Sequence, residues 1–338
     1  MNENKILHVM ILDKFLAPFI DFVDENFGRE NHHYVFITSE KYEYGLTPEH
    51  KVEFLHTDDD IFITLLKYMK MAKRIILHGL WRDKVDILLY FNQELLKKCY
   101  WVMWGGDFYF PETKSNIRHE VIRNIGNLIT YVKGDYELAQ KWYDSSGEYH
   151  ECFMYPSNLY KEYDITQEKY TTTNIQLGNS ADPTNNHIEV LKKLEKYKNE
   201  DIKIFAPLSY GDQVYAQDVI KKGKKLFGDK FIPLTEFMPF EKYLEFLGKI
   251  DIAIFAHKRQ QAMGNIITLL GLGKKVYIRN DITPWELFKD INVKVFNIQD
   301  FKIDLIDEQI KKANQQKIRE YFSKENYLNQ LKNLFESK

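Results

Sequence analysis

The sequence has few cysteines and no long apolar run. Cys99 and Cys152 are its only cysteines, and they form no CxxC pair. No apolar stretch approaches 18 residues, and no signal peptide precedes the first expected strand. We therefore expect a cytosolic protein with reduced thiols, which would meet a membrane only from the cytoplasmic surface.

Several familiar enzyme motifs are also missing. The sequence contains no GxGxxG, no Walker loop, no GxSxG and no HExxH, which excludes the usual dehydrogenase, kinase, hydrolase and zincin assignments. A formal charge of -2 argues against nucleic acid as the main partner. Aromatic residues make up 15% of the chain. Such residues suit carbohydrate and nucleobase surfaces, but they also fill protein cores.

Short apolar runs alternate with longer amphipathic runs, a pattern typical of β-α-β units and a parallel sheet. In the first half, the expected strands are 6–12, 33–38, 51–56, 74–79, 100–104 and 128–133. In the second half, they are 175–180, 202–210, 230–237, 251–257, 274–280 and 293–298. We predict two Rossmann-like α/β domains that face a cleft, as the length of 338 residues allows. Their expected ranges are 1–155 and 174–338, with a linker over 156–173 and a helical tail over 306–336.

In such sheets, ligands bind beyond the carboxyl ends of the strands. The stretch "CYWVMWGGDFYF" (99–110) ends a buried strand at Gly105 and Gly106, where glycine permits a tight turn. Asp107 is then expected at the mouth of the cleft; alternatively, it caps the next helix. Asp13, which ends the first strand in the same way, is the rival candidate for a catalytic base. His78 ends another strand and is a candidate acceptor contact.

The second half contains the clearer phosphate-binding pattern, in "DIAIFAHKRQQAMGNIITLLGLGKKVYI". Lys258 and Arg259 directly precede a helix whose first N–H groups, over 263–266, can hold an anion. A solvated basic loop is the alternative. The uncharged groups suited to sugar hydroxyls are Gln260, Gln261 and Asn265.

A partner loop, "LGNSADPTNNH" (177–187), follows another strand. Gly178 lets the backbone approach a ligand closely, while Asn179 and Ser180 supply donors; the rest of the loop could be turn and cap chemistry. We also place Tyr210 and Glu236, at the ends of two further strands, on the donor side. The acidic triplet in "HTDDD" (56–60) is explained by capping of the following helix, so no metal is expected.

Two helical segments mix basic and apolar residues and could rest on anionic lipid headgroups, although a solvated face is the favoured interpretation. One of them, 63–74, carries Lys67, Lys70, Lys73 and Arg74. The other, 110–126, carries Lys114, Arg118, His119 and Arg123.

The stretches "WGGDFY", "GNSADPTNNH" and "RQQAMG", with "HGLW" upstream, resemble a known family. It is glycosyltransferase family 56, the 4-acetamido-4,6-dideoxygalactose (Fuc4NAc) transferases, also described as 4-alpha-L-fucosyltransferases. The resemblance keeps the same order from about residue 6 to residue 330. It implies a two-domain GT-B fold, a dTDP-sugar donor and an undecaprenyl-diphosphate-linked saccharide acceptor at the inner membrane surface.

Carried onto this sequence, the family's W-G-x-D pattern falls on Trp104, Gly105 and Asp107. Its G-N-S-x-D pattern falls on Gly178, Asn179, Ser180 and Asp182, and its R-Q-Q stretch falls on Arg259, Gln260 and Gln261. Gly106 and Lys258 are local variations. Trp104, Gly105 and Gly106, with His78, are the expected acceptor-side residues.

Together, these features predict a metal-independent GT-B glycosyltransferase that moves a Fuc4NAc-like or fucose-like sugar in surface polysaccharide biosynthesis. Arg259 and the helix start near Gly264 would stabilise the departing diphosphate. Asp107 is the first candidate for the base and Asp13 the second, a role that holds for an inverting reaction. A nucleotide-sugar epimerase of the same fold and a non-catalytic sugar-nucleotide-binding protein are the alternatives.

Overall fold

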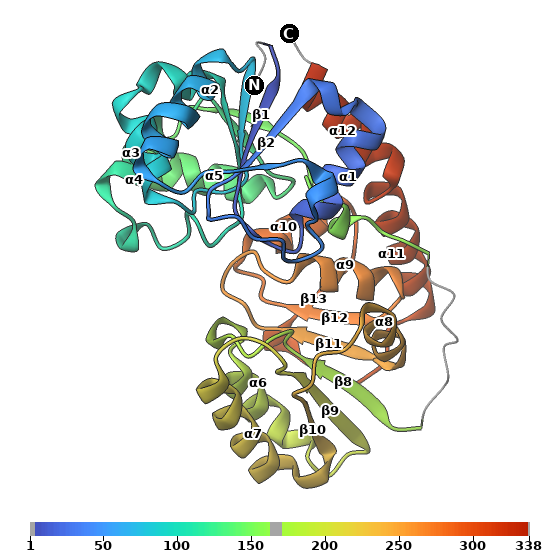
Figure 1. The fold of residues 1–338 in the computed structure, drawn as a ribbon. Helices are drawn as coiled ribbons and strands as arrows, with labels where there is room; N and C mark the ends of the chain where they lie inside the picture. The colour runs from blue at the N-terminus through green and yellow to red at the C-terminus, as the bar shows by residue number, and fades with distance from the viewer. Residues whose placement is uncertain (1–3, 163–170, 337–338) are drawn as a thin grey trace. The chain divides into compact units, whose positions relative to one another are not determined.

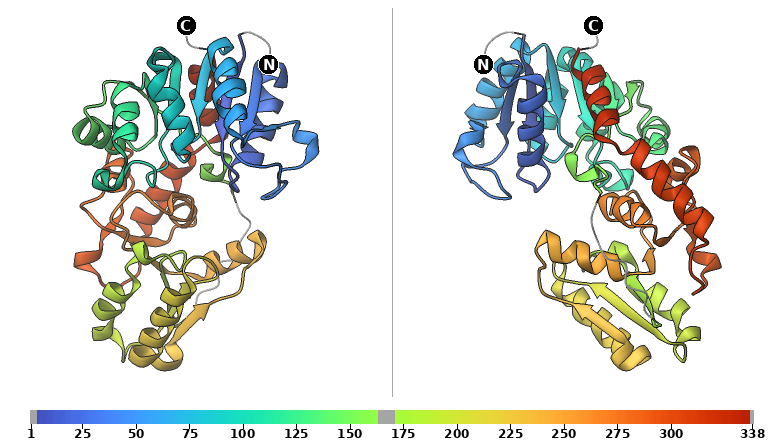
Figure 2. Two further views of the ribbon diagram at one scale, coloured as in Figure 1. Left: turned by 60° about the vertical axis from the view of Figure 1, so that its left-hand side comes forward. Right: turned by 90° about the vertical axis from the view of Figure 1, so that its right-hand side faces the viewer.

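A computed structural model describes residues 4–162 and 171–336 of the chain. The chain forms two compact units. Unit 1 comprises Met1–Leu159 and Glu325–Lys338, and unit 2 comprises Tyr160–Lys324. In each unit a parallel sheet carries helices on both of its faces (Figures 1 and 2), which confirms the predicted α/β class.

Unit 1 is built on a seven-stranded parallel sheet in the order β3-β2-β1-β4-β5-β6-β7. Its strands are β1 (Ile6–Met10), β2 (His32–Phe36), β3 (Glu53–Phe54), β4 (Arg74–Leu77), β5 (Cys99–Val102), β6 (Asn127–Ile129) and β7 (Glu148–His150). Its main helices are α1 (Leu16–Phe27), the π-helical η3 (Asp60–Leu65), α2 (Leu66–Met71), α3 (Asp83–Phe91), α4 (Asn116–Asn124), α5 (Lys133–Tyr143) and α12 (Lys324–Glu336).

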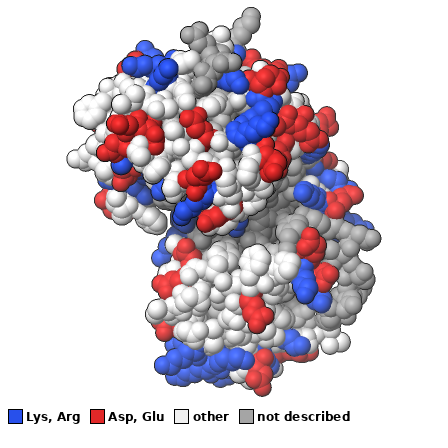
Figure 3. All heavy atoms as spheres, in the orientation of Figure 1, with Lys and Arg blue, Asp and Glu red and all other residues white. Residues whose placement is uncertain are grey.

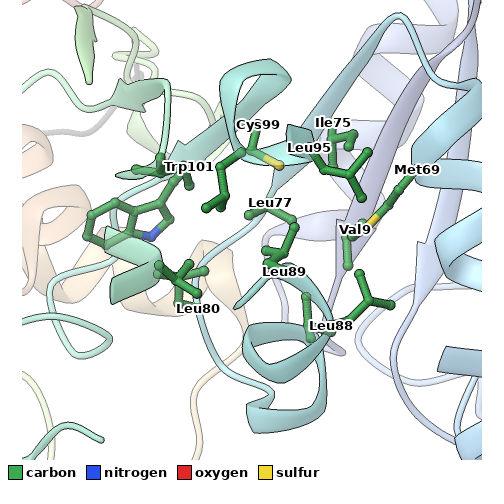
Figure 4. Packing of buried hydrophobic residues seen from close by; sticks show 14 of the residues in the cluster. Val9, Met69, Ile75, Leu77, Leu80, Leu88, Leu89, Leu95, Cys99 and Trp101 are labelled. Carbon is green, nitrogen blue, oxygen red and sulfur yellow. The ribbon is translucent and has the colours of Figure 1, made fainter. Parts of the chain in front are cut away.

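Alternating side chains on each strand divide this sheet into two buried faces. On β1, Leu7 and Val9 belong to a cluster that also takes in buried side chains of α2, α3, α4 and α5. Figure 4 shows Trp101 at one end of this cluster, near Leu80. His8 lies on the other face, where the rings of Phe19 from α1 and Phe335 from α12 pack against it. A polar side chain is thus buried in the middle of an apolar layer.

The last helix belongs to unit 1, which corrects the predicted domain of 174–338. Its Tyr327 packs against Phe22 of α1 and Phe153, and its Phe335 packs against Phe27 and His32. The main-chain oxygen of Leu334 also accepts a hydrogen bond from Arg74. The apolar side of α12 therefore covers the His8 face of the first sheet, although α12 and this sheet are far apart in the sequence.

Unit 2 is built on a six-stranded parallel sheet in the order β10-β9-β8-β11-β12-β13. Its strands are β8 (Thr173–Leu177), β9 (Ile202–Pro207), β10 (Phe231–Leu234), β11 (Ile252–Phe255), β12 (Lys275–Ile278) and β13 (Phe296–Asn297). Its main helices are α6 (His187–Leu194), α7 (Gln213–Phe227), α8 (Phe240–Lys249), α9 (Met263–Gly271), α10 (Thr283–Asp290) and α11 (Glu308–Tyr321). Lysines gather over α7 (Figure 3), where Lys224 and Lys225 occupy the last turn and complement the helix dipole.

Each predicted strand overlaps an observed strand, although most observed strands are shorter, and β2, β5, β6 and β8 begin one or two residues earlier than predicted. The short strand β7 and the helices α5 and α10 were not predicted. The predicted tail helix is divided between α11 and α12. The predicted linker, 156–173, falls partly outside the described residues, and its last residue already belongs to β8.

Candidate functional site

Each sheet reverses its strand order at one point: between β1 and β4 in unit 1, and between β8 and β11 in unit 2. At such a point, the loops that leave the two central strands diverge and leave room for a ligand beyond their carboxyl ends. In unit 2, the predicted donor-binding residues from Gly178 to Ser180 follow β8, and those from Lys258 to Gln261 follow β11. Tyr210 and Glu236 follow β9 and β10 instead. In unit 1, Asp13 follows β1 and His78 follows β4, while Trp104 and Asp107 follow the neighbouring strand β5.

The loop after β8 is organised by a buried amide, that of Asn185. Its Oδ1 accepts hydrogen bonds from the main-chain N–H of Asn179 (3.0 Å) and from Nε2 of His257 (3.0 Å). Its Nδ2 donates to Oγ of Ser180 at 3.3 Å. Gly178 has φ +68°, and a Cβ there would lie 2.7 Å from Asn185 Oδ1, so only glycine fits. One amide thus links the loops after β8 and β11.

The loop after β11 leads into α9 with an open helix start. Ala262, the residue before the helix, adopts a left-handed conformation (φ 59°, ψ 23°) and offers no side-chain cap to the first N–H groups. A non-glycine residue held there is strained, a feature that clusters at functional sites. Gly264 and Asn265 lie in the first turn of α9, as predicted. The uncapped N–H groups and the helix dipole suit an anion.

Polar side chains from both loops surround this helix start. Arg259 is half-buried and Lys258 is exposed, just before α9. Gln261 Oε1 accepts a hydrogen bond from Thr184 Oγ1 of the β8 loop at 2.9 Å. Gln260 is half-buried in the same segment. The predicted basic loop and the predicted partner loop are therefore brought together.

The remaining predicted donor residues lie less centrally. Tyr210 receives a hydrogen bond from Asn179 Nδ2 (3.1 Å), while Asn179 Oδ1 is buried with no partner among the described residues. Asn265 Oδ1 accepts from Tyr243 of α8 at 2.8 Å, so it ties two helices together rather than standing open. Glu236 is exposed after β10.

Sequence reasoning missed Asn185 and His257 as organisers of this site. Asn185 was weighed only as turn chemistry, although it is fully buried. Burial lowers the pKa of His257 to about 3, so this ring is neutral and donates from Nε2. The sequence position of His257 could have indicated this role, because a histidine at the end of a buried strand must form a hydrogen bond with another protein group.

In unit 1, Asp107 is fully buried, which contradicts its predicted place at an open mouth. Its Oδ2 accepts from the N–H of Leu80 (3.0 Å) and from Nε1 of Trp101 (2.7 Å). Its Oδ1 accepts from the N–H of Trp104 at 3.2 Å. Burial raises the pKa of Asp107, and these donors oppose that shift. The carboxylate points inward and holds the loops after β4 and β5 together.

The two glycines before Asp107 make different contributions. Gly105 has φ +82°, a left-handed conformation that favours glycine. A Cβ on Gly106 would lie 2.8 Å from the indole ring of Trp81, so Gly106 leaves room for that ring. Trp81 also lines a small hollow at the switch point, together with Met10, Gly79 and Arg82.

His78 is fully buried, so it is not an open acceptor contact as predicted. Its Nδ1 lies 2.9 Å from the hydroxyl of Tyr155, and its Nε2 lies 3.1 Å from Nδ1 of His8. Trp104, which is half-buried, donates from Nε1 to the same Tyr155 hydroxyl at 2.9 Å. Tyr155 and His8 were not identified from the sequence, although a histidine inside the apolar run "ILHVMIL" was visible.

Asp13 has the accessibility that Asp107 lacks. It is half-buried in the loop after β1, where its Oδ1 accepts a long hydrogen bond, 3.3 Å, from the N–H of Phe15. Burial raises the pKa of Asp13, while the N–H groups of Phe15 and Lys14 and the charge of Lys14 lower it. A half-buried carboxylate with a raised pKa suits proton abstraction.

Half-buried aromatic rings stand beside Asp13. The rings of Phe15 and Trp104 meet edge to face at 5.7 Å, and those of Trp81 and Trp104 do so at 5.8 Å. We call Phe15, Trp81 and Trp104 the aromatic edge. Such rings offer flat apolar surfaces, and an indole also offers an N–H donor.

Of the acidic triplet, Asp60 takes part in the cap at the start of its helix, where the Thr57 hydroxyl accepts a hydrogen bond from the N–H of Asp60 at 3.1 Å. Asp60 Oδ2 accepts from the N–H groups of His56 (3.1 Å) and Thr57 (2.9 Å). In the described part of the chain, no three His, Cys, Asp or Glu side chains converge as a ligand set for a metal ion. Among the same residues, no helix combines the length and the apolar character needed to cross a bilayer.

The segments considered for lipid contact are partly buried. Arg74 and Arg118 are only 5% and 8% exposed, and Arg118 forms an ion pair with the buried Asp86 at 2.6 Å. Lys67 and Lys70 are exposed, as are Phe62 and Ile63 one turn earlier. The basic side chains of these segments that stay exposed are Lys67 and Lys70 of α2, Lys73 after it and Arg123 of α4.

Two parallel-sheet units with loops of this kind define a GT-B glycosyltransferase. A glycosyltransferase from Rickettsia africae aligns over 99% of this chain and 98% of its own, with a TM-score of 0.71 at 12% identity. Anabaena HepE, solved in complex with UDP, aligns over 99% and 100%, with a TM-score of 0.71 at 12% identity. WaaG, a glycosyltransferase involved in lipopolysaccharide biosynthesis, aligns over 98% and 100%, with a TM-score of 0.63 at 12% identity.

The family profile of the 4-alpha-L-fucosyltransferases, glycosyl transferase group 56, matches residues 10–337. The chain belongs to this family, and it is a glycosyltransferase.

Proposed function

We propose that this enzyme transfers a deoxyamino sugar, Fuc4NAc-like or fucose-like, from a dTDP-sugar to a lipid-linked or other glycan acceptor in surface polysaccharide biosynthesis. The observation that carries the proposal is the uncapped start of α9, which Arg259 and Gln261 flank in a member of group 56. A nucleoside diphosphate is the natural occupant of such a site. HepE, which shares the fold, was solved with UDP.

The departing diphosphate is stabilised without a metal ion in this proposal. Arg259 can pair with phosphate oxygens through two N–H groups, and Lys258 adds a second positive charge. The first N–H groups of α9 point at the same place, and the helix dipole adds to their effect. These groups are preorganised, so they stabilise the charge that develops on the leaving group.

Asp13, rather than Asp107, is the base in this mechanism. The acceptor hydroxyl oxygen bonds to the anomeric carbon of the donor, the bond from that carbon to the diphosphate oxygen breaks, and the hydroxyl proton passes to the Asp13 carboxylate. This single displacement inverts the anomeric configuration. The aromatic edge beside Asp13 supplies the surface on which an acceptor sugar packs.

The acceptor's lipid would hold the enzyme at the cytoplasmic face of the inner membrane. Exposed Phe62 and Ile63 on η3 and exposed Lys67 and Lys70 on α2 combine an apolar and a basic surface. Such a pair of features favours anionic interfaces. In a vesicle flotation assay, phosphatidylglycerol-containing vesicles should carry more protein than phosphatidylcholine vesicles, and Lys67→Gln with Lys70→Gln should reduce that difference.

The decisive experiment is donor turnover by the purified protein. It would be offered dTDP-Fuc4NAc and, separately, other dTDP-, UDP- and GDP-sugars, with and without a lipid-linked disaccharide and with EDTA present. Release of nucleoside diphosphate that requires acceptor and survives EDTA supports the proposal. Consumption of donor without acceptor would indicate an epimerase or hydrolase. Binding without any turnover would leave a sugar-nucleotide-binding protein.

The same assay tests the base. Asp13→Asn should lower kcat by about 100- to 1000-fold with a small change in either KM, because the variant retains shape but not basicity. Asp21→Asn, an exposed carboxylate change on α1, serves as the control. If Asp13→Asn retains wild-type kcat, or if NMR of the product shows retained configuration, Asp13 is not the base.

A further inference from the structure

Three buried histidines form a continuous hydrogen-bonded chain through unit 1. His32 on β2 lies 2.9 Å (Nδ1) from Nε2 of His8 on β1. His8 Nδ1 lies 3.1 Å from Nε2 of His78, whose Nδ1 lies 2.9 Å from the Tyr155 hydroxyl. Trp104 Nε1 reaches the same hydroxyl at 2.9 Å. The mechanism above uses none of the three histidines.

The Trp104 indole N–H, which can only donate, determines the direction of every hydrogen bond in this series. An indole N–H can only donate, so the Tyr155 hydroxyl accepts from Trp104 and must send its own proton to His78 Nδ1. A neutral His78 then carries its proton on Nε2 and donates to His8. His8, in turn, donates from Nε2 to His32 Nδ1. All three rings are therefore expected as the Nε2–H tautomer.

The rings are held neutral by their surroundings. Burial lowers the pKa of His78 to about 3 and that of His32 to about 4, and burial is also the main cause of the lowered pKa of His8. Arg29 and Lys5 lower the pKa of His32 further. A proton delivered along the chain would have to rest beside these cations, so the chain is unsuited to carrying protons away from the substrate.

The chain ends at the aromatic edge. The Tyr155 ring stacks on Phe15 (5.7 Å between centroids, 26° between planes) and meets Trp104 edge to face at 5.5 Å. Its hydroxyl fixes the indole of Trp104, while Asp107 fixes the Trp104 main chain. At the other end, Phe335 of α12 packs against His8 and His32. Trp104 is therefore held through a chain of groups that reaches the C-terminal helix.

We propose that His32, His8, His78 and Tyr155 are positioning residues that hold the Trp104 indole in place for the acceptor sugar beside Asp13. The claim that Trp104 contacts an acceptor sugar rests on the proposed function. The claims about the histidine tautomers and the orientation of the indole do not. None of these four residues touches substrate in this proposal. Their effect reaches the reaction only through the orientation of Trp104.

The first test is NMR of the whole protein at pH 7. Long-range ¹H–¹⁵N spectra should show His8, His32 and His78 all as Nε2–H tautomers. A ring that carries its proton on Nδ1, or on both nitrogens, would overturn the proposed order of donors. The Trp104 indole resonance, one of five in the protein, is assigned by its loss in Trp104→Phe.

The second test breaks the chain at His8, a side chain remote from the edge. His8→Met removes both hydrogen bonds at similar volume, whereas His8→Gln keeps one donor and one acceptor. His8→Met should shift the Trp104 indole resonance and raise the acceptor KM about tenfold with donor KM unchanged, and His8→Gln should restore both towards wild type. His150→Met is the control, because His150 bonds to Asn127 in the same sheet but lies outside the chain.

The outcomes separate the two proposals. An unmoved Trp104 resonance in folded His8→Met overturns the positioning role. A fall of the apparent kcat in parallel with the folded fraction, with both KM values unchanged, also overturns it, since that result indicates a structural role only. If His8→Met does not fold, Tyr155→Phe keeps the ring, removes the hydroxyl and is read in the same way. If the wild-type protein transfers no sugar, the proposed function fails. The histidine tautomers and the shift of the Trp104 resonance still show whether the hydrogen-bonded chain holds the indole.

Discussion

At the scale of single residues, a carboxylate's role follows from how deeply it is buried and which donors it already has. Asp107 accepts three hydrogen bonds from N–H groups and is fully buried, whereas Asp13 is half-buried and accepts from the N–H groups of Phe15, at 3.3 Å, and Lys14. A base must receive a proton from the acceptor hydroxyl, so an oxygen whose directions are occupied is poorly suited. Burial raises the pKa of both groups, so that shift alone does not separate them.

Asp107→Asn should therefore be a stability variant. The amide has one acceptor oxygen, and its NH₂ would face N–H donors, so we expect the free energy of unfolding to fall by about 3 kcal/mol. Chemical denaturation monitored by tryptophan fluorescence measures this. Asp13→Asn, at a half-buried carboxylate whose amide replacement keeps an acceptor oxygen, should stay within about 1 kcal/mol of wild type. Unchanged stability with lost turnover in Asp107→Asn would return the base to Asp107.

At the scale of elements, α9 and the two loops around it form one unit of the proposed donor site. Arg259→Gln should raise the donor KM roughly 10- to 100-fold and leave the acceptor KM unchanged, because it removes a charge-assisted contact with the leaving group. Steady-state kinetics with each substrate varied in turn measures this. Gln213→Ala, at the exposed start of α7, is the matched control. Equal changes in both KM values would show that Arg259 does not act on the donor.

The C-terminal helix α12 is a second element whose role is open to measurement. Phe335 is 5% exposed and packs against His8, His32 and Phe27. Phe335→Ala should destabilise the protein by about 3 to 5 kcal/mol, as for large-to-small changes in a core. Leu305→Ala, at a side chain that is 63% exposed, should cost less than about 0.5 kcal/mol. A Phe335→Ala variant as stable as wild type would mean that α12 is only loosely attached.

The sequence predicts elements better than it predicts the use of single side chains. Buried strands such as β1 and β11 are apolar on both faces, so their positions follow from composition alone. The loops after β8 and β11 were also predicted, because a strand followed by glycine or basic residues and then a helix is a local pattern. The roles of Asp107 and His78 were not, because they depend on Leu80, Trp101 and Tyr155, partners that only the folded chain brings close. The place of α12 likewise depends on a contact between the two ends of the sequence.

At the scale of the whole molecule, the chain builds its first unit with its two ends and its second unit with its middle. The segment up to Leu159 supplies the first sheet, and α12 completes its cover after unit 2 has been traversed. Each unit also buries histidines: His8, His32 and His78 in unit 1, and His187 and His257 in unit 2. Both units are therefore expected to lose stability in acid.

Acid should destabilise the protein through these histidines. Burial lowers the pKa of His187 and His32 to about 4 and that of His257 and His78 to about 3. Their folded values lie below the ordinary value, so the unfolded chain binds protons first as pH falls. Their contribution to stability is full above about pH 6.5 and declines below it, by about 2 kcal/mol per ring at pH 5.

Buried carboxyl groups oppose this trend in part. Burial raises the pKa of Asp86 to about 6, and it also raises the pKa of Asp13 and Asp107. As pH falls, these carboxyl groups bind protons in the folded protein before they do so in the unfolded chain. Protonation therefore removes the free-energy cost of burying their charge. A variant that changes one histidine and leaves the carboxyl groups in place separates the two effects.

His78→Gln is that variant, since glutamine keeps one donor and one acceptor but does not titrate. Its free energy of unfolding should fall less than that of wild type between pH 7 and pH 5, by about 2 kcal/mol, because the unfolded variant has one fewer proton to bind. Urea denaturation at half-unit intervals of pH measures both curves, and their separation at pH 8 gives the baseline cost of the substitution. Curves that stay parallel down to pH 5 would mean that His78 titrates alike in the folded and the unfolded protein. A variant that loses more stability than wild type as pH falls would mean that His78 is already protonated in the folded protein, which would also contradict the neutral tautomer that the chain from Trp104 to His32 requires.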